Sequence, residues 1–461
     1  MADGLAAPDH SPADGLTLKQ RRWATVAIFT ALAMASLDTA IANIALPAIA
    51  ADLRATPADV IWVVNVYQIA MVATLLPLGA LGEIVGHQRI YIGGLILFTA
   101  ASVFCALAWS LETLLIARVL QGLGASGIMS VNTALVGFVY PRHRLGRGFG
   151  HNALVVATSF TLGPTIASAI LSVATWPWLF AINLPFGLLA IAIGLKTLPK
   201  TSRATHGFDI PGAVLASGCL GLLILGLGSA AHQTAPVVVI GELVAGLLFG
   251  WLLLRRQAGH PAPMLPVDLF RRPVFALSAA TAICAFSVQG LAFVSLPFYF
   301  EDVLHRSQVE TGFFLTPWPL VVGIMAPIAG RLSDRYPAGM LGGIGLLMLG
   351  IGMALLAMLP PEPSIANIVW RMVICGAGFG FFQAPNMKAL MGSAPPGRSG
   401  SASGIVATAR LTGQTTGAAL AAFCFGMIGH AGAATWALAL GAGFAAVGCV
   451  LSFMRLAVRP S

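Results

Sequence analysis

Charge is scarce along this chain: only 9% of its 461 residues are Asp, Glu, Lys or Arg, and 57% are hydrophobic. A soluble globular chain carries about 25% charged residues, so a soluble fold is excluded. A helix that crosses the ~30 Å hydrocarbon core of a bilayer needs about 20 apolar residues. We therefore expect an all-α integral membrane protein. Its apolar runs predict fourteen spans, near residues 23–46, 60–81, 90–109, 112–138, 149–172, 178–198, 210–230, 236–254, 274–299, 312–332, 340–359, 365–388, 402–428 and 433–454.

Basic residues are distributed unevenly between the predicted loops. With the N-terminus assigned to the cytoplasm, 20 of the 25 Lys and Arg residues fall on that side, and only Arg54 and Arg306 fall on the other. Cytoplasmic loops carry such an excess, so we expect both termini in the cytoplasm, in a bacterial-type inner membrane. The net charge of +9 then reflects topology and predicts no nucleic-acid partner. The first apolar run continues to Ala45, so it is expected to span rather than to be cleaved as a signal peptide.

Two motifs occur twice along the chain. The acidic residues Glu83 and Asp334 lie in similar loop segments 251 residues apart, and Arg118 and Arg371, each followed by glycines, are 253 apart. Paired halves are a known transporter plan, with the substrate site at the midplane between them. The predicted organisation is a cytoplasmic tail (1–22), an N-terminal six-helix half (23–198), an inserted two-helix segment (199–273), a C-terminal six-helix half (274–454) and a second cytoplasmic tail (455–461).

Five segments resemble the motifs of one family, in the order in which that family carries them. They are Leu37–Pro47, Gly79–Arg89, Arg118–Gly124, Gly163–Pro164 and Trp176–Gly187. The chain thereby resembles the major facilitator superfamily, and within it the fourteen-helix drug:proton antiporter family of multidrug efflux transporters. This resemblance implies a major facilitator fold, proton antiport and a role in antibiotic resistance.

The family motifs also suggest roles for individual residues. Counting 1.5 Å per residue along each helix places Asp38 and Arg118 at about the same depth, and the family has an acid and an arginine near its cavity at these positions. We expect the two residues to form an alternating pair that couples transport to protons; the alternative is a static buried ion pair. The resemblance implies a conformational latch at Gly79, Glu83, Gly86, Arg89, Asp334 and Arg335. The helix-packing motif is expected at Gly122, Gly124, Gly163 and Pro164.

Polar and aromatic residues inside the spans are candidates for lining a cavity of mixed character, suited to amphiphilic cargo. They are Asn43, Tyr67, Gln68, Asn132, Phe286, Gln289, Trp318, Arg371, Gln383, Asn386 and Arg410. Gln289 stands 251 residues after Asp38, so proton coupling is expected in the N-terminal half. Arg371 and Arg410 have no evident acidic partner, which keeps an anionic cargo open. Glu242, in the inserted segment, is expected to serve helix packing rather than transport.

These features predict a secondary active transporter that exports amphiphilic drugs or toxic compounds as protons enter. The partners are a small amphiphilic molecule, protons and the lipid bilayer; a periplasmic adaptor is left open. The chain has no Gly-rich nucleotide-binding motif and no Cys or His at metal spacing, so we expect no ATP, no metal and no cofactor.

Other functions remain as alternatives. Within transporters, the chain could be a dedicated exporter or translocase of one metabolite or lipid. An enzyme is a remote alternative, because no nucleophile and base occur together. A sensor is equally remote, because no loop is long enough for an output domain. The direction of transport rests on the family resemblance alone.

Overall fold

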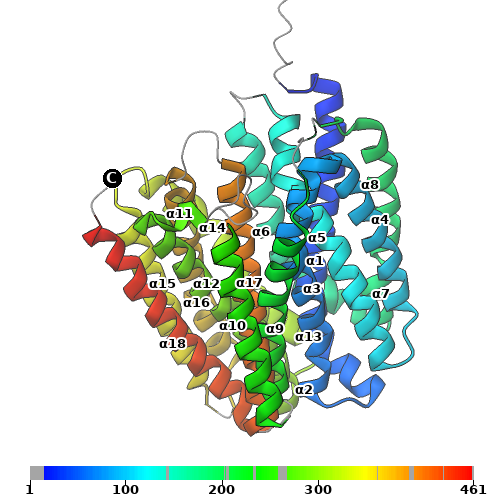
Figure 1. Ribbon diagram of the computed structural model, residues 1–461. Coiled ribbons are helices and arrows are strands. Elements are labelled where there is room, and N and C mark those ends of the chain that lie inside the picture. The colour runs from blue at the N-terminus through cyan, green and yellow to red at the C-terminus, as the bar shows by residue number, and fades with distance from the viewer. Residues whose placement is uncertain are drawn as a thin grey trace, which may run out of the picture.

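The computed structural model describes residues 15–141, 145–201, 203, 207–231, 235–257, 267–360, 362–393, 399–428 and 430–458. In this part of the chain the structure is a bundle of long helices that run roughly side by side (Figure 1). The N-terminal half contains α1 (Leu18–Leu53), α2 (Pro57–Val60), α3 (Trp62–Val85), α4 (His87–Ala106), α5 (Leu111–Val139), α6 (Leu145–Leu171), α7 (Pro177–Ala181) and α8 (Asn183–Thr197).

The remaining helices form an inserted pair and the C-terminal half. The inserted pair is α9 (Ile210–Ala231) and α10 (Pro236–Gln257). The C-terminal half contains α11 (Val267–Phe270), α12 (Pro273–Phe298), a π-helix (Tyr299–Val303), α13 (Gln308–Leu315), α14 (Pro317–Leu332), α15 (Ala338–Ala357), α16 (Ile365–Gly392), α17 (Ser399–Ile428) and α18 (His430–Ala457).

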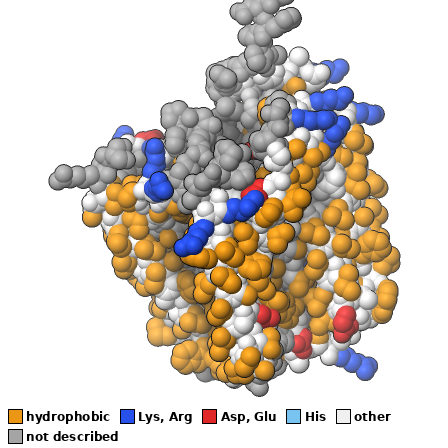
Figure 2. Space-filling model, viewed as in Figure 1, with side chains coloured by type: hydrophobic (Ala, Val, Ile, Leu, Met, Phe, Trp, Pro, Cys, Tyr) orange, Lys and Arg blue, Asp and Glu red, His pale blue; other side chains and the backbone are white. Residues whose placement is uncertain are grey.

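The helices have the length and composition of membrane spans. Among the described residues, twelve helical segments are long and apolar enough to cross a bilayer. The helices α6 and α9, of 27 and 22 residues, have shorter apolar stretches, at 162–171 and 210–226. The all-α membrane fold is therefore confirmed, whereas the count of fourteen spans stays a prediction. Figure 2 shows hydrophobic side chains spread broadly over the visible face of the bundle.

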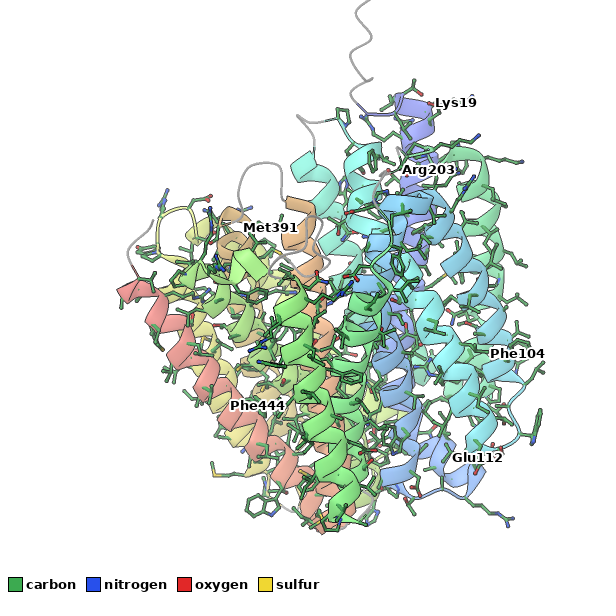
Figure 3. All side chains as sticks on the ribbon, viewed as in Figure 1. Lys19, Phe104, Glu112, Arg203, Met391 and Phe444 are labelled. Atoms are coloured by element: carbon green, nitrogen blue, oxygen red, sulfur yellow. The ribbon has the colours of Figure 1, made fainter. Side chains whose placement is uncertain are left out.

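The two ends of the bundle differ in charge. Lys19, Arg203 and Met391 lie toward one end and Glu112 toward the other (Figure 3). Most of the visible Lys and Arg side chains gather toward the first end (Figure 2), which we call the basic end. The helices reach further here than the sequence predicted: α1 begins at Leu18 and α18 ends at Ala457, inside the predicted tails. Residues 1–14 and 459–461 of those tails lie outside the described part.

Glycine contacts show that the two halves are built alike. A Cβ atom on Gly122 of α5 would lie 2.4 Å from the Tyr67 carbonyl oxygen of α3, and one on Gly376 of α16 would lie 2.4 Å from the Trp318 carbonyl oxygen of α14. Two positions further on, Gly124 and Gly378 meet the backbones of α4 and α15 just as closely. Only glycine allows helices to approach to this distance.

The hydrophobic core joins the halves at one end and separates at the other. Away from the basic end, a single cluster contains residues of both halves, such as Ile49 of α1 and Phe293 of α12. Toward the basic end the core divides into one cluster made chiefly of N-terminal residues, including Tyr91, and another that includes Phe275 and Leu390. The bundle is therefore closed at one end and divided at the other.

The inserted pair lies outside the two halves. In Figure 1, α9 and α10 (green) stand in front of the bundle, and α9 packs against α3 and α17, which belong to different halves. The Ser217 hydroxyl of α9 donates to the Ala73 carbonyl oxygen of α3 at 2.8 Å. Asp209 starts α9 by accepting from the Gly212 amide at 3.0 Å, and it binds Arg256 of α10 at 2.8 Å. The predicted packing residue Glu242 lies on α10.

Candidate functional site: a buried ion pair beside a cavity

Asp38 and Arg118 form a buried ion pair in the N-terminal half. Asp38 lies on α1 and Arg118 on α5, and Arg118 Nη1 donates to Asp38 Oδ2 at 2.5 Å. The side chains are 1% and 0% exposed. The depth argument from helical rise thus predicted two residues that the fold places in contact. Removing either partner would leave an uncompensated charge in the low-dielectric interior.

Three neutral polar side chains surround the carboxylate. Gln121 Nε2 donates to Asp38 Oδ1 at 2.8 Å and to Ser102 Oγ at 2.9 Å. Asn183 Nδ2 lies 3.4 Å from the same Asp38 oxygen. These residues come from α5, α4 and α8 and are all buried. With Asp38 and Arg118 they form what we call the polar nest.

The sequence reasoning assigned no role to the three neutral members of the polar nest. Gln121 and Asn183 stood inside quoted motifs, and Gln121 lies three residues after Arg118, which places both on one helix face. That spacing was a usable signal. Ser102 offered none, because a single serine in an apolar helix is ordinary.

Aromatic rings close the other sides of the guanidinium. The Arg118 carbon Cζ lies 4.2 Å from the centre of the Tyr67 ring and 5.4 Å from that of Phe180. Arg118 Nε donates to the Val63 carbonyl oxygen at 2.9 Å. Tyr67, predicted to line the cavity, therefore belongs to the wall of the polar nest, where cation–π attraction supports the buried charge.

Among its described residues, the C-terminal half shows no charged pair equivalent to Asp38 and Arg118. The matching contacts of Gly122 and Gly376 align positions 254 residues apart, so the counterpart of Arg118 is Met372 rather than Arg371. A shift of one residue turns a side chain by about 100° around an α-helix. The separation of 253 in the sequence repeat was thus one residue short of the structural register.

The Arg371 side chain instead contacts residues of its own helix, α16. Its Nη1 atom donates to the Asn367 carbonyl oxygen at 2.7 Å and also contacts the Asn367 side-chain oxygen. Its guanidinium carbon lies 4.6 Å from the centre of the Trp370 ring. Gln289, which stands where the repeat places the counterpart of Asp38, accepts from Gln414 Nε2 at 2.9 Å. The charged pair therefore exists in one half and an amide pair in the other.

A cavity of about 250 Å³ lies between the halves and reaches the basic end. Residues of α1, α5 and α6 form one wall, and residues of α12, α16 and α17 form the other. Five predicted lining residues are found here: Asn132, Phe286, Gln383, Asn386 and Arg410. The sequence reasoning missed the further lining residues Leu32, Met129, Thr133, Asn152, Val156, Ala282, Phe382, Met387, Leu390, Met391, Val406 and Ala407.

Six other predicted lining residues lie outside this cavity. Trp318 is fully buried and packs its ring against Phe293, with centroids 5.4 Å apart. Asn43 and Gln68 are buried at 5% and 3% exposure. The others are Tyr67, Gln289 and Arg371, whose contacts are given above. Five of the eleven predicted lining residues therefore line this cavity, and six lie elsewhere in the bundle.

At the end opposite the basic end, α6 meets α13 and α14. The hydroxyl oxygens of Thr165 and Thr316 lie 3.1 Å apart, and the Ser168 hydroxyl donates to the Gln308 carbonyl oxygen at 3.1 Å. A Cβ on Gly312 would lie 2.9 Å from the Pro164 carbonyl oxygen. We call this contact the seam. It closes the cavity from the opposite end.

The predicted latch residues lie around the loops at the basic end. Gly86 separates α3 from α4 with a φ of 109°, a conformation that L-residues rarely adopt. Asp334, a predicted latch residue, binds Lys388 of α16 at 2.6 Å, a residue that the prediction did not include. The reach of a lysine from the neighbouring helix makes this contact possible.

The remaining predicted latch residues lie on two neighbouring helices: Gly79 and Glu83 on α3, and Arg89 on α4. Gly163 and Pro164 lie on α6, where a Cβ on Gly163 would lie 2.4 Å from the Ala40 Cβ of α1. Gly163 therefore lets α6 approach α1 closely.

Comparison with known proteins places the whole chain in one group. A sequence model described as Major Facilitator Superfamily matches residues 28–418. The uncharacterized transporter YebQ of Escherichia coli is 51% identical over 91% of this chain and 92% of its own length. The riboflavin transporter RibZ of Clostridioides difficile is 31% identical over 85% and 86% of the two chains. A tetracenomycin C resistance and export protein of Streptomyces glaucescens is 30% identical over 89% and 77%.

A solved structure has the same arrangement of helices. A crystal structure of a POT family transporter matches with a TM-score of 0.72 over 95% of this chain and 96% of that one, at 13% sequence identity. The fold, the family match and the named relatives agree that the protein is a transporter rather than an enzyme. The chain belongs to the Major Facilitator Superfamily.

Proposed function

We propose that this protein exports small amphiphilic molecules in exchange for protons, by alternating access of one central cavity. The observation that carries the proposal is the buried pair of Asp38 and Arg118, a carboxylate and a guanidinium on α1 and α5, two helices that also line the cavity between the halves. Ionisable residues inside membrane spans are costly and mark ion pathways and proton relays. The basic end is proposed to face the cytoplasm of a bacterial inner membrane, following the excess of Lys and Arg.

In the conformation described, Asp38 is enclosed and paired. A proton that reached Asp38 would neutralise the carboxylate, and Arg118 would lose its charged partner while it stayed buried. Gln121 and Asn183 would then also lose a charged acceptor for their amide groups. The nest therefore has different packing energies in its two protonation states, which is the requirement for coupling a proton to movement of the halves.

The loops at the basic end are proposed to act as a latch in the other conformation. In this one the basic end is divided, and Asp334 is paired within its own half, with Lys388. Closing the basic end would bring the turn at Gly86, with Glu83 at the end of α3 and Arg89 at the start of α4, toward the opposite half. Charged loop residues on both sides can then pair across the closed end.

The names of two relatives bear on the choice of cargo. The Streptomyces relative is named for resistance and export, and the Clostridioides relative for riboflavin transport. The first favours export of toxic compounds. The second supports the alternative function, transport of one dedicated metabolite, because it shows that a relative of similar identity is named for a single vitamin.

An efflux assay tests the proton coupling. Cells that lack their main pumps are loaded with an amphiphilic dye, and its loss is followed with and without a pH gradient, in the native protein and in Asp38→Asn. Asp52→Asn is the matched control, because Asp52 is an acid on the same helix whose partner is the Trp176 indole, 2.7 Å away. We expect gradient-driven efflux in the native protein and in Asp52→Asn, and its loss in Asp38→Asn. Gradient-driven efflux by Asp38→Asn at the native rate would refute the coupling role.

A further inference from the structure

The central cavity carries one charge, and that charge is positive. Arg410 of α17 is the only charged side chain among the described residues that line the cavity. The helices α5, α6, α12, α16 and α17, which supply most of its walls, contain a single acidic residue in their sequences, Glu112 at the start of α5. Glu112 lies toward the opposite end of the bundle (Figure 3).

The acids of the remaining wall helix are already engaged. Helix α1 contributes Leu32 to the cavity and contains two carboxylates. Asp38 is bound to Arg118, and Asp52 accepts from the Trp176 indole nitrogen. No acid within the lining helices is therefore placed to neutralise Arg410 in the described conformation.

Arg410 itself is poorly satisfied by the protein. Its Nη2 atom contacts the Met129 sulfur at 3.3 Å, and its Nε atom is buried without a hydrogen-bond partner among the described residues. A guanidinium has five N–H donors, and a thioether sulfur is a weak acceptor. The contact also crosses the cavity, since Met129 belongs to α5 of the N-terminal half. A cation that is partly withdrawn from water without a charged partner is unfavourable, so a ligand that brings negative charge would be bound favourably.

Three buried arginines among the described residues have other acceptors, although Arg118 Nη2 and Arg371 Nε are also without a described hydrogen-bond partner. Arg118 has Asp38 as its partner, and Arg371 has the carbonyl and side-chain oxygens of Asn367. Arg455 of α18 donates to the Asn386 side chain at 2.7 Å and to the Ser278 hydroxyl at 3.0 Å. Each of these three guanidiniums is held by oxygen acceptors of the protein, whereas the described acceptor of Arg410 is sulfur.

The same contacts limit what the neighbouring amide can do. The Asn386 side-chain oxygen accepts from Arg455, and its nitrogen donates to the Ser278 carbonyl oxygen at 3.1 Å. Asn386 is therefore committed to the protein although it lines the cavity. Phe286, Phe382 and Met387 supply apolar surface in the same wall.

We propose that the cargo site of this transporter takes an amphiphilic anion, whose carboxylate or sulfonate pairs with Arg410 while its apolar body lies against Phe286, Phe382 and Met129. This inference rests on the proposed function, because it names the substrate class of the same cavity. A guanidinium binds a carboxylate through two parallel N–H donors, which provides both affinity and orientation. The cavity of about 250 Å³ is near the lower end of small-molecule sites, so a compact aromatic acid is the ligand of best size.

A binding experiment on the purified full-length protein in lipid nanodiscs tests the charge preference. Three probes share one aromatic body: 2-naphthoate, 2-naphthylmethanol and 2-naphthylmethylammonium, titrated by calorimetry. We expect 2-naphthoate to bind at least tenfold more tightly than either of the others. Equal or tighter binding of the ammonium compound, or no binding of 2-naphthoate by the folded protein, would overturn the proposal.

Variants assign the preference to Arg410. Arg410→Gln is expected to lower the affinity for 2-naphthoate about tenfold, to that of the alcohol, and Arg410→Lys is expected to keep most of the preference. Arg371→Gln is the matched control, since it removes an intramembrane arginine that lies outside the cavity, and it is expected to bind as the native protein does. Unchanged alcohol binding by Arg410→Gln shows that the site remains folded. An undiminished preference for 2-naphthoate in that variant would refute the role of Arg410.

A transport measurement separates this inference from the proposed function. Anion exit and proton entry both move positive charge inward, so an inside-negative potential is expected to accelerate 2-naphthoate export in proteoliposomes. Selective binding without gradient-driven transport would refute proton-coupled export and leave the anion site standing. Gradient-driven export of cationic probes with no preference for anions would refute the anion site and leave proton-coupled export standing.

Discussion

Alanine in place of Gly122 is expected to destabilise the protein and to disturb the polar nest. The added Cβ would lie 2.4 Å from the Tyr67 carbonyl oxygen, where ordinary contacts begin at 3.4 Å. Helices α3 and α5 must therefore move apart by about 1 Å, a form of overpacking that typically costs about 1–3 kcal/mol. Tyr67 lies over the Arg118 guanidinium, so the displacement reaches the ion pair directly.

The matched control lies on the same helix. Gly137 of α5 has nothing within 4 Å of an added Cβ, so Gly137→Ala gains helix propensity of about 0.5–1 kcal/mol without a clash. Because both substitutions gain the same propensity, the difference between their free energies of unfolding measures the overpacking alone. We expect that difference to be about 1–3 kcal/mol.

Unfolding by SDS in mixed micelles, followed by tryptophan fluorescence, gives the free energies. Gly376→Ala, at the equivalent contact with Trp318, should destabilise by a similar amount and leave proton coupling intact, because the C-terminal half has no polar nest. Gly122→Ala should reduce proton-driven transport as well. Equal stability of Gly122→Ala and Gly137→Ala would refute the close packing, and equal loss of coupling in Gly122→Ala and Gly376→Ala would refute the assignment of coupling to one half.

Further predictions concern the seam, a turn and a buried cation. Cysteines at Thr165 and Thr316 should form a disulfide on oxidation, because the two hydroxyl oxygens are 3.1 Å apart. Transport should stop when the disulfide forms and return when it is reduced. Transport by the oxidised double variant at the native rate would contradict the expectation that the seam opens during transport. Gly86→Ala should lower the free energy of unfolding by about 1–3 kcal/mol, because its φ of 109° is strained for alanine; an unchanged SDS midpoint would contradict this. Arg455→Leu should cost about 1–3 kcal/mol by leaving Asn386 without its donor, and Arg455→Lys should recover part of the loss.

Sequence reasoning predicted the membrane fold because long apolar runs have few other structures available to them. It also predicted which acid and which arginine meet. The depth of each residue follows from the helical rise along its own helix, and a buried charge requires a partner at the same depth. It did not predict the complete polar nest, because Asn183 reaches Asp38, and Ser102 reaches Gln121 and Asn183, from helices whose rotation about their axes is set by packing. No periodicity in the sequence reports that rotation.

The cavity was predicted less well for the same reason. Asn132 and Gln383 face it, whereas Gln68 and Trp318 face other helices. Arg371 is the clearest case: a separation one residue short of the structural register moved it from the expected position of Arg118 to the helix surface. Repeats in a sequence locate equivalent helices. A difference of one residue in the spacing of the repeat, however, changes the helix face on which each side chain lies.

The composition of the seam contributes to how easily the transporter changes state. Two hydroxyl contacts join α6 to α13 and α14 there, Thr165 with Thr316 and Ser168 with Gln308. At about 0.5–1.5 kcal/mol each, these contacts stabilise the closed seam by roughly 1–3 kcal/mol, a factor of about 5 to 150 in an equilibrium constant. The apolar core that joins the halves at this end adds to them. A cargo molecule or a proton therefore reverses the populations only when its preference for the other conformation exceeds the hydroxyl contacts and the shared apolar contacts together.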